Sequence, residues 1–157
     1  MRKPYVLLVD DNKITTKLLH RYLDANGYET SEAYDGQECL ERVAERHPDA
    51  IVLDVMMPRL DGYQTAAKLK EDPATAKIPI VIVTALNDVK NQLKAIEAGS
   101  DDFLNKPIEE KLLVAKVKLL SNLKLALDKC DYMEQHLEKA LKGELTGTTI
   151  EEIREKF

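Results

Sequence analysis

The stretch Ala50-Ile51-Val52-Leu53-Asp54-Val55-Met56-Met57-Pro58 predicts a strand that is buried on both faces. Its apolar residues do not alternate with polar ones, as they would in a half-exposed strand, and Pro58 ends the run. Asp54 lies near the carboxyl end, where a carboxylate is costly unless a metal, a cation or hydrogen bonds compensate it. Ligand sites of open parallel sheets lie beyond these strand ends. Asp54 is therefore a candidate functional residue, although a strand-end acid can equally cap the next helix.

Three other apolar runs end in polar residues that suit the same kind of site. Residues 5–9 are followed by Asp10 and Asp11, residues 80–83 by Thr84, and residues 103–105 by Lys106. Three carboxylates together favour a hard divalent cation bound through oxygen. A hydroxyl and an ammonium beside them can hold the oxygens of a transferred phosphoryl group.

This combination of residues resembles the receiver (REC) domain of two-component response regulators. The matching positions keep the family's order and spacing over residues 3–122: Asp10-Asp11, Asp54, Met57-Pro58, Asp61-Gly62, Thr84-Ala85, Gly99 and Lys106-Pro107. A single acid pair would be a weak signal, whereas several strand ends matched in order are specific.

The alternation of apolar runs and helical patterns predicts an α/β fold with a parallel sheet. Strands are expected near residues 5–9, 28–33, 80–83 and 103–105 and within 50–58, and helices near residues 13–26, 36–46, 62–70 and 88–98. The more polar second strand suits a sheet edge. The resemblance implies a flavodoxin-like (βα)5 doubly wound sheet with strand order 2-1-3-4-5, and a site at the switch point between strands 1 and 3.

The resemblance also implies roles for the acids. Asp54 would be the phosphoacceptor, whose carboxylate attacks a phosphohistidine on a sensor histidine kinase or a phosphotransfer protein. Asp11 would bind Mg²⁺ directly and Asp10 mainly through water. Asp54 and the backbone carbonyl of Met56 would complete the protein ligands.

Three further residues complete the implied site. Lys106 would neutralise the carboxylates and then pair with the phosphoryl group, and its bond to Pro107 is expected to be cis. Thr84 would donate its hydroxyl to a phosphoryl oxygen. Phe103 occupies the family's switch-aromatic position, where plain core packing is an equally simple role. Phosphorylation would then change the surface built around the last strand and last helix.

Two alternatives to a phospho-switch are open. A true enzyme with an aspartyl-phosphate intermediate, such as a haloacid-dehalogenase-type phosphatase, needs a second acid two residues after the nucleophile, and Met56 stands there. The chain is therefore not expected to be an enzyme beyond its own phosphorylation and dephosphorylation. A phosphorylation-independent interaction domain with the same fold usually loses an acid, the Thr or the Lys, and this chain has all of them.

The last helical pattern is unusually long. It begins near Ile108 and meets no Gly or Pro before Gly143. Its first two turns are expected to pack on the sheet, and the remainder to pair with a second copy in a parallel coiled coil. The expected seam is broken by Lys116 and Glu134 and consists of Leu113, Leu120, Leu123, Leu127, Cys130, Leu137 and Leu141. A solvated helix, or one folded back on its own domain, is the alternative.

The chain is thus divided into a receiver domain (1–122), an extended helix or coiled-coil stalk (123–143), and a linker with the start of a possible output module (144–157). Residues 149–152, with sequence Thr-Ile-Glu-Glu, fit a capping box that opens another helix. Residues 144–147 are faintly similar to the start of diguanylate cyclase domains, and residues 151–157 to the lead-in of class III nucleotide cyclases. The output activity is left open between these and others.

Composition and charge argue against several classes of protein. The chain has 157 residues and a net charge of −5, which argues against direct contact with nucleic acid, because phosphate binding needs a basic face. No apolar run approaches the roughly 20 residues that span a bilayer. Cys39 and Cys130 fall in helical patterns without a CxxC partner, and residues 1–4 lead into a strand without a signal peptide. Reduced thiols and a cytoplasmic location are expected.

Overall fold

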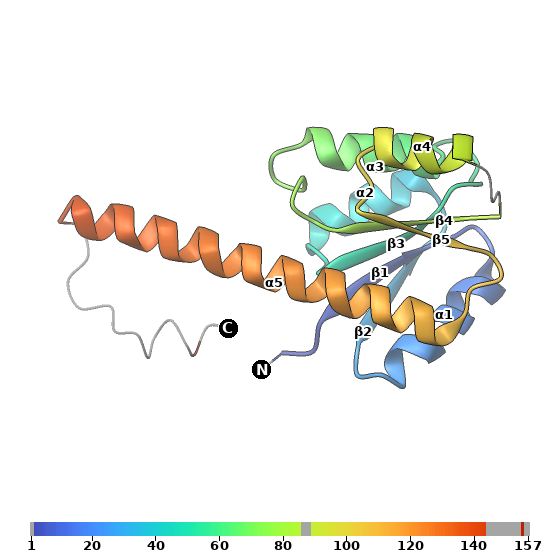
Figure 1. Cartoon of the computed structure of the whole chain (residues 1–157), viewed down its shortest axis with the longest axis horizontal. Helices are drawn as coiled ribbons and strands as arrows, with labels where there is room; N and C mark the ends of the chain where they lie inside the picture. The colour runs from blue at the N-terminus through green and yellow to red at the C-terminus, as the bar shows by residue number, and fades with distance from the viewer. Residues whose placement is uncertain (1, 86–88, 144–154, 156–157) are drawn as a thin grey trace.

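The computed structural model describes residues 2–85, 89–143 and 155. Strands and helices alternate along the described chain (Figure 1). The strands are β1 (Tyr5–Val9), β2 (Glu29–Ala33), β3 (Ala50–Asp54), β4 (Ile80–Thr84) and β5 (Asp102–Asn105). The helices are α1 (Lys13–Asp24), α2 (Gly36–Glu45), α3 (Gly62–Glu71), α4 (Val89–Glu97) and α5 (Glu110–Leu141).

The strands form one parallel sheet in the order β2-β1-β3-β4-β5. The predicted flavodoxin-like order is confirmed, and β2 lies at an edge as its polar sequence predicts. All five residues of β1, β3 and β4 are buried, because helices cover both faces of the sheet at these strands. The chain order reverses between β1 and β3, so the ends of these two strands flank the switch point.

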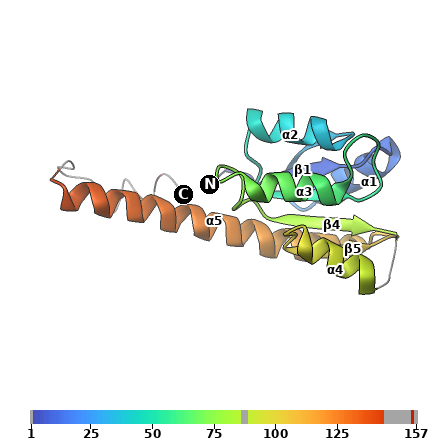
Figure 2. The ribbon, with the colours of Figure 1, turned by 90° about the horizontal axis from the view of Figure 1, so that it is seen from above.

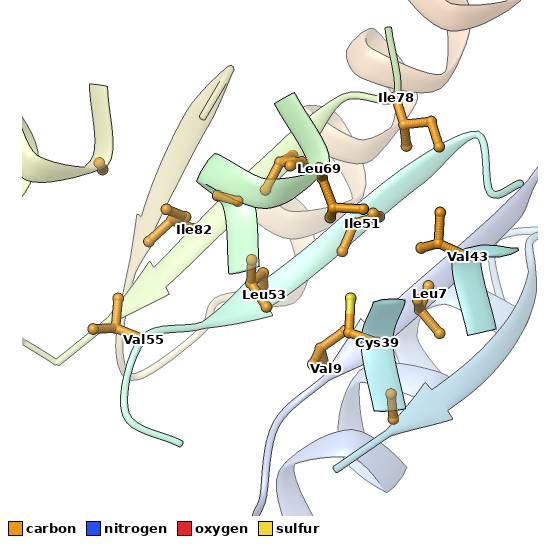
Figure 3. Close-up of a cluster of buried hydrophobic side chains, with 14 residues drawn as sticks. Leu7, Val9, Cys39, Val43, Ile51, Leu53, Val55, Leu69, Ile78 and Ile82 are labelled. Atoms are coloured by element: carbon orange, nitrogen blue, oxygen red, sulfur yellow. The ribbon is translucent and has the colours of Figure 1, made fainter. Parts of the chain in front are cut away.

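Alternate residues of the central strands enter two separate cores. One face of the sheet packs against α2, α3 and α4, where Leu7, Ile51 and Ile82 meet side chains such as Cys39 and Leu69 (Figure 3). The other face packs against α1 and α5, and its core consists of Val6, Leu8, Val52, Val81, Val83, Leu19, Leu23, Leu113, Val117 and Leu120, among others. The helices lie on the two sides of the sheet in Figures 1 and 2.

Local sequence signals fix the helix ends. The side chain of Asn12 accepts hydrogen bonds from the backbone N–H groups of Ile14 and Thr15 in the first turn of α1. Asp61 and Gln64 form a reciprocal capping box at the start of α3. Gly27 has a φ of 86°, a left-handed conformation that suits glycine directly after α1. The sequence offers Asn87 and Asp88 as N-cap candidates directly before α4, and both lie outside the described residues.

Helix α5 is the longest element, with 32 residues, and its outer half extends beyond the sheet (Figures 1 and 2). Its predicted extent is confirmed, but the prediction that only two turns pack on the domain is wrong. Residues as late as Lys124 are buried, and Lys77 from the α3–β4 connection reaches both carboxylate oxygens of Asp131 at 2.6 and 2.7 Å. The helix therefore follows its own domain for more than half of its length.

Two expectations concern parts of the chain that the structure describes only in part. Within the described residues, no helix combines the length and hydrophobicity that a bilayer-spanning segment needs. The linker and possible output module expected at residues 144–157 lie outside the described residues, except for Glu155.

Candidate functional site

Three carboxylates converge at the carboxyl ends of β1 and β3. Asp10 and Asp11 follow β1, Asp54 is the last residue of β3, and one oxygen from each lies within 4.8 Å of the others. Asp10 and Asp54 are buried, with 3 % and 4 % of their surface exposed, whereas Asp11 is exposed. Carboxylate oxygens in such a group are the donors that a hard divalent cation prefers, so the residues present fit Mg²⁺.

Lys106 joins the acids from the end of β5. Its Nζ lies 2.9 Å from Oδ1 of Asp54 and 3.2 Å from Oδ2 of Asp10. The predicted cis bond between Lys106 and Pro107 is present. Asp10 is also held by the backbone N–H of Asn12, which donates to its Oδ1 at 2.9 Å. One ammonium thus compensates two of the three clustered carboxylates.

The charges of this cluster shift the acid–base equilibria of its members. Burial raises the pKa of Asp54 above its ordinary value, and the neighbouring Asp10 and Asp11 add to the rise, while the bond from Lys106 opposes it. Burial alone would lower the pKa of Lys106, but its hydrogen bond to Asp54 and the nearby carboxylates outweigh this and raise it. Lys106 is therefore cationic. Asp54 lies among more carboxylate charge than this one ammonium neutralises, and a divalent cation would neutralise the remainder.

Thr84 and Phe103 lie on the two strands beside this cluster. Thr84 ends β4 and is 4 % exposed, and it directly follows Val83, the register partner of Asp54. Its carbonyl accepts the backbone N–H of Lys106 at 2.9 Å. Phe103 in β5 is half-buried, and Nζ of Lys116 lies 6.0 Å from the centre of its ring.

The alternative role of Asp54 as a helix cap does not hold, because Asp61 caps α3. The turn between them is tight. A Cβ added to Gly62 would come within 2.3 Å of the carbonyl oxygen of Asp54 and 2.9 Å of Cα of Val55. Glycine is needed here because the start of α3 packs directly on the backbone that carries Asp54. Met56 lies in this same turn, and its side chain is 70 % exposed.

Sequence reasoning missed one residue near the site. Arg59, in the turn after β3, has a φ of 68°, and its guanidinium donates to the carboxylate of Asp35, the N-cap of α2. The pair ties the turn that follows Asp54 to a neighbouring helix. A positive φ favours Gly, Asn or Asp, so an Arg in this place gives no sequence signal.

The fold and the acidic cluster together define a doubly wound α/β domain of the flavodoxin-like type. Residues 6–118 match the model of the response regulator receiver domain, and the chain belongs to this family. Receiver domains are signalling domains rather than enzymes of metabolism.

Curated relatives and solved structures agree with this assignment. The chain is 44 % identical to response regulator PleD of Caulobacter vibrioides over 123 residues, which cover 78 % of this chain and 27 % of PleD. It is 41 % identical to response regulator MprA of Mycobacterium ulcerans over 115 residues, 73 % of this chain and 49 % of MprA. The receiver domain of Francisella response regulator 1452 superposes with a TM-score of 0.72 at 33 % identity, covering 76 % of this chain and 98 % of that one. The chain therefore spans half or less of the length of these two curated relatives.

Proposed function

We propose that this chain is a phospho-accepting receiver that takes a phosphoryl group on Asp54 from a sensor histidine kinase or a phosphotransfer protein. One observation carries the proposal: the cluster of Asp10, Asp11 and Asp54, compensated by Lys106, lies at the carboxyl ends of adjacent strands. A buried acid group with one cation is expensive for the fold unless it binds something. Family membership supports the same role.

In the proposed reaction, a carboxylate oxygen of Asp54 attacks the phosphorus of a phosphohistidine. The P–N bond breaks, the imidazole leaves as the neutral base after taking a proton, and an acyl phosphate forms. Asp10, Asp11, Asp54 and the carbonyl of Met56 would hold Mg²⁺, which would supply positive charge to the phosphoryl oxygens. Lys106 exchanges its bond to the carboxylate for one to the incoming phosphoryl group. Thr84 donates its hydroxyl to a phosphoryl oxygen.

The signal is proposed to leave the site through β4 and β5. Thr84 moves toward the phosphoryl group, and Phe103 turns inward into the space that Thr84 leaves. The shift requires that the phosphoryl group interacts better with this arrangement than with the resting one. We propose that the receiver (1–122) then acts on a homodimer formed through the stalk (123–143), and on an output module that begins within 144–157.

The proposal is tested by incubating the protein with Mg²⁺ and acetyl phosphate and measuring its intact mass. A gain of one phosphoryl group is expected in the wild type and in Asp61→Asn, and none in Asp54→Asn. Asp61 is the matched control because it is an acid of the same turn that caps α3 instead of facing the cluster. Asp11→Ala should raise the Mg²⁺ concentration needed for half-maximal labelling. Labelling that persists in Asp54→Asn would contradict Asp54 as the phosphoacceptor. An unlabelled wild type would favour the phosphorylation-independent interaction domain.

A further inference from the structure

Helix α5 carries two apolar faces, and only one of them packs on its own domain. The inner face is buried against the sheet and α1, and its buried residues are Leu113, Val117, Leu120, Ser121 and Lys124. Successive residues of a helix turn by about 100°, so these five positions lie within one narrow sector. The inner face continues as far as Asp131, which Lys77 holds at 2.6 Å.

The second face lies on nearly the opposite side of the helix and is open to solvent. We call it the outer stripe, and its exposed residues are Leu119, Leu123, Ala126, Cys130, Met133 and Leu137. The four larger members Leu119, Leu123, Met133 and Leu137 have 68 %, 46 %, 58 % and 62 % of their surface exposed. Ala140 continues the stripe toward the end of the helix.

The spacing of the outer stripe is that of a coiled-coil seam. From Leu119 to Ala140 its steps alternate strictly between four and three residues, which makes about three heptads without a charged member. Heptad position a is then occupied by Leu123, Cys130 and Leu137. The remaining members occupy d positions.

The structure thereby corrects the seam expected from the sequence. That seam used Leu113 and Leu120, which are buried in the domain's own core, and it met a charge at Glu134. The outer stripe is rotated away from the core and passes through Met133 instead of Glu134.

We propose that the occupant of the outer stripe is a second copy of this chain, packed in parallel and in register along α5. This inference rests on the proposed function, because it supplies the surface through which the homodimer would form. In a parallel coiled coil, heptad position g, which directly precedes position a, lies beside position e of the partner helix. Position e directly follows position d and stands five residues later in the sequence. Lys129 and Glu134 have this spacing, so a parallel dimer brings opposite charges together twice. An antiparallel pair would not match them.

The outer stripe also has a physical connection to the phosphorylation site. Lys116 takes the a position between Leu112 and Leu119, at the end of the stripe nearest the site. Its Nζ binds Oδ2 of Asp102 in β5 at 2.7 Å and lies over the ring of Phe103. An inward turn of Phe103 would change the surroundings of this lysine, which lies about one helical turn before the first residue of the outer stripe.

The dimer is tested first by disulfide cross-linking of the full chain with diamide. Cys130 is exposed and Cys39 is buried, so Cys130 is the accessible thiol of the described residues. Facing a positions of a parallel coil bring two Cα atoms within the range that a disulfide spans. A cross-linked dimer is expected for the wild type and none for Cys130→Ser.

Relocated cysteines then separate the parallel from the antiparallel arrangement. In the Cys130→Ser background, Leu137→Cys should cross-link, and the matched control Gln135→Cys, two residues away on the other side of the helix, should not. Cross-linking at Cys130 without cross-linking of Leu137→Cys would contradict the parallel arrangement. Equal cross-linking at positions 135 and 137 would contradict the outer stripe.

Sedimentation supplies a measurement that needs no new cysteine. Met133→Glu should raise the dimer dissociation constant about tenfold or more, whereas Gln135→Glu, which introduces the same charge outside the stripe, should leave it unchanged. A wild-type monomer at high concentration, with and without acetyl phosphate and Mg²⁺, would overturn the proposal. Both variants should still be labelled on Asp54, so a failed dimer and a failed phosphorylation are distinguishable.

Discussion

Lys106 Nζ lies 2.9 Å from Oδ1 of Asp54, and this ion pair joins the end of β5 to the end of β3 across the intervening strand β4. The pair fixes the candidate nucleophile in the resting state and leaves it still surrounded by two further acids. In the proposed reaction, the same lysine would follow the negative charge from the carboxylate of Asp54 to the phosphoryl group.

Asp54→Asn should stabilise the protein in the absence of Mg²⁺. The pKa of Asp54 is raised by burial and by the neighbouring acids, so the folded chain binds more protons than the unfolded chain between the two pKa values. The contribution of this carboxyl group to the free energy of unfolding therefore falls as the pH rises from the pKa of the unfolded state through the pKa of the folded state. The free energy of unfolding of the variant should equal that of the wild type in acid. At neutral pH it should exceed the wild-type value by about 1 kcal/mol, which corresponds to about 2–4 °C in Tm.

The measurement is thermal unfolding of both proteins from pH 3 to pH 8. Added Mg²⁺ should reduce the difference, because it neutralises the wild-type cluster and leaves the variant with one ligand fewer. A variant that is less stable than the wild type at neutral pH without Mg²⁺ would show that the acid cluster is not a net burden on the fold.

Thr84→Ala should separate phosphorylation from its structural consequence. Asp54 keeps its acids and Lys106 in this variant, so labelling by acetyl phosphate is expected to continue. The variant lacks the hydroxyl that is proposed to bind a phosphoryl oxygen, so residue 84 should no longer move toward the site and Phe103 should not turn inward. Amide NMR spectra of β4, β5 and α5 should shift on phosphorylation in the wild type and much less in the variant. Thr75→Ala, at a buried threonine far from the acid cluster in the chain, is the control.

Gly62→Ala should disturb the site although residue 62 carries no functional group. The new Cβ would lie 2.3 Å from the carbonyl oxygen of Asp54, so either α3 or the end of β3 must shift. We expect a loss of about 1–3 kcal/mol in the free energy of unfolding by urea, together with slower labelling of Asp54. Gly27→Ala is the matched control. It costs about 1 kcal/mol of left-handed backbone strain in open space, and labelling should be unchanged.

The two cysteines should differ sharply in reactivity. Burial, with smaller contributions from Asp35 and Glu38, raises the pKa of Cys39 to about 12, so its thiolate is scarce at neutral pH. Cys130 is exposed on α5. A colorimetric thiol titration should find one reactive thiol per native chain and two in denaturant. Fast modification of Cys39 in the native protein would show that the core around α2 opens readily.

Much of this fold follows from the sequence because β1, β3 and β4 are buried on both faces. Such strands are continuous apolar runs, and a polar residue directly after them is conspicuous. Asp10, Asp54 and Thr84 could be located in this way, whereas Lys106 follows β5, which is only partly buried. The prediction of which α5 residues form the coiled-coil seam was wrong for a related reason. Leucines occur on both of its faces, and only the packed structure shows that Leu120 faces the sheet while Leu119 faces solvent.

The turn after β3 marks another limit. Arg59 adopts a positive φ to reach Asp35, and this geometry is imposed by tertiary packing rather than by the preference of arginine. No local pattern distinguishes it from any other loop arginine. The capping box of Asp61 and Gln64, by contrast, is a local signal that the same turn does contain.

The central claim is that Asp54 accepts the phosphoryl group, and borohydride trapping tests it most directly. Borohydride reduces an aspartyl phosphate to homoserine, which marks the modified position permanently in the peptide. After treatment with Mg²⁺ and acetyl phosphate, peptide mass spectrometry should find homoserine at position 54 and aspartate at positions 10 and 11. Homoserine at either of those two positions, or unmodified aspartate at position 54 in a protein whose intact mass had gained a phosphoryl group, would contradict the account.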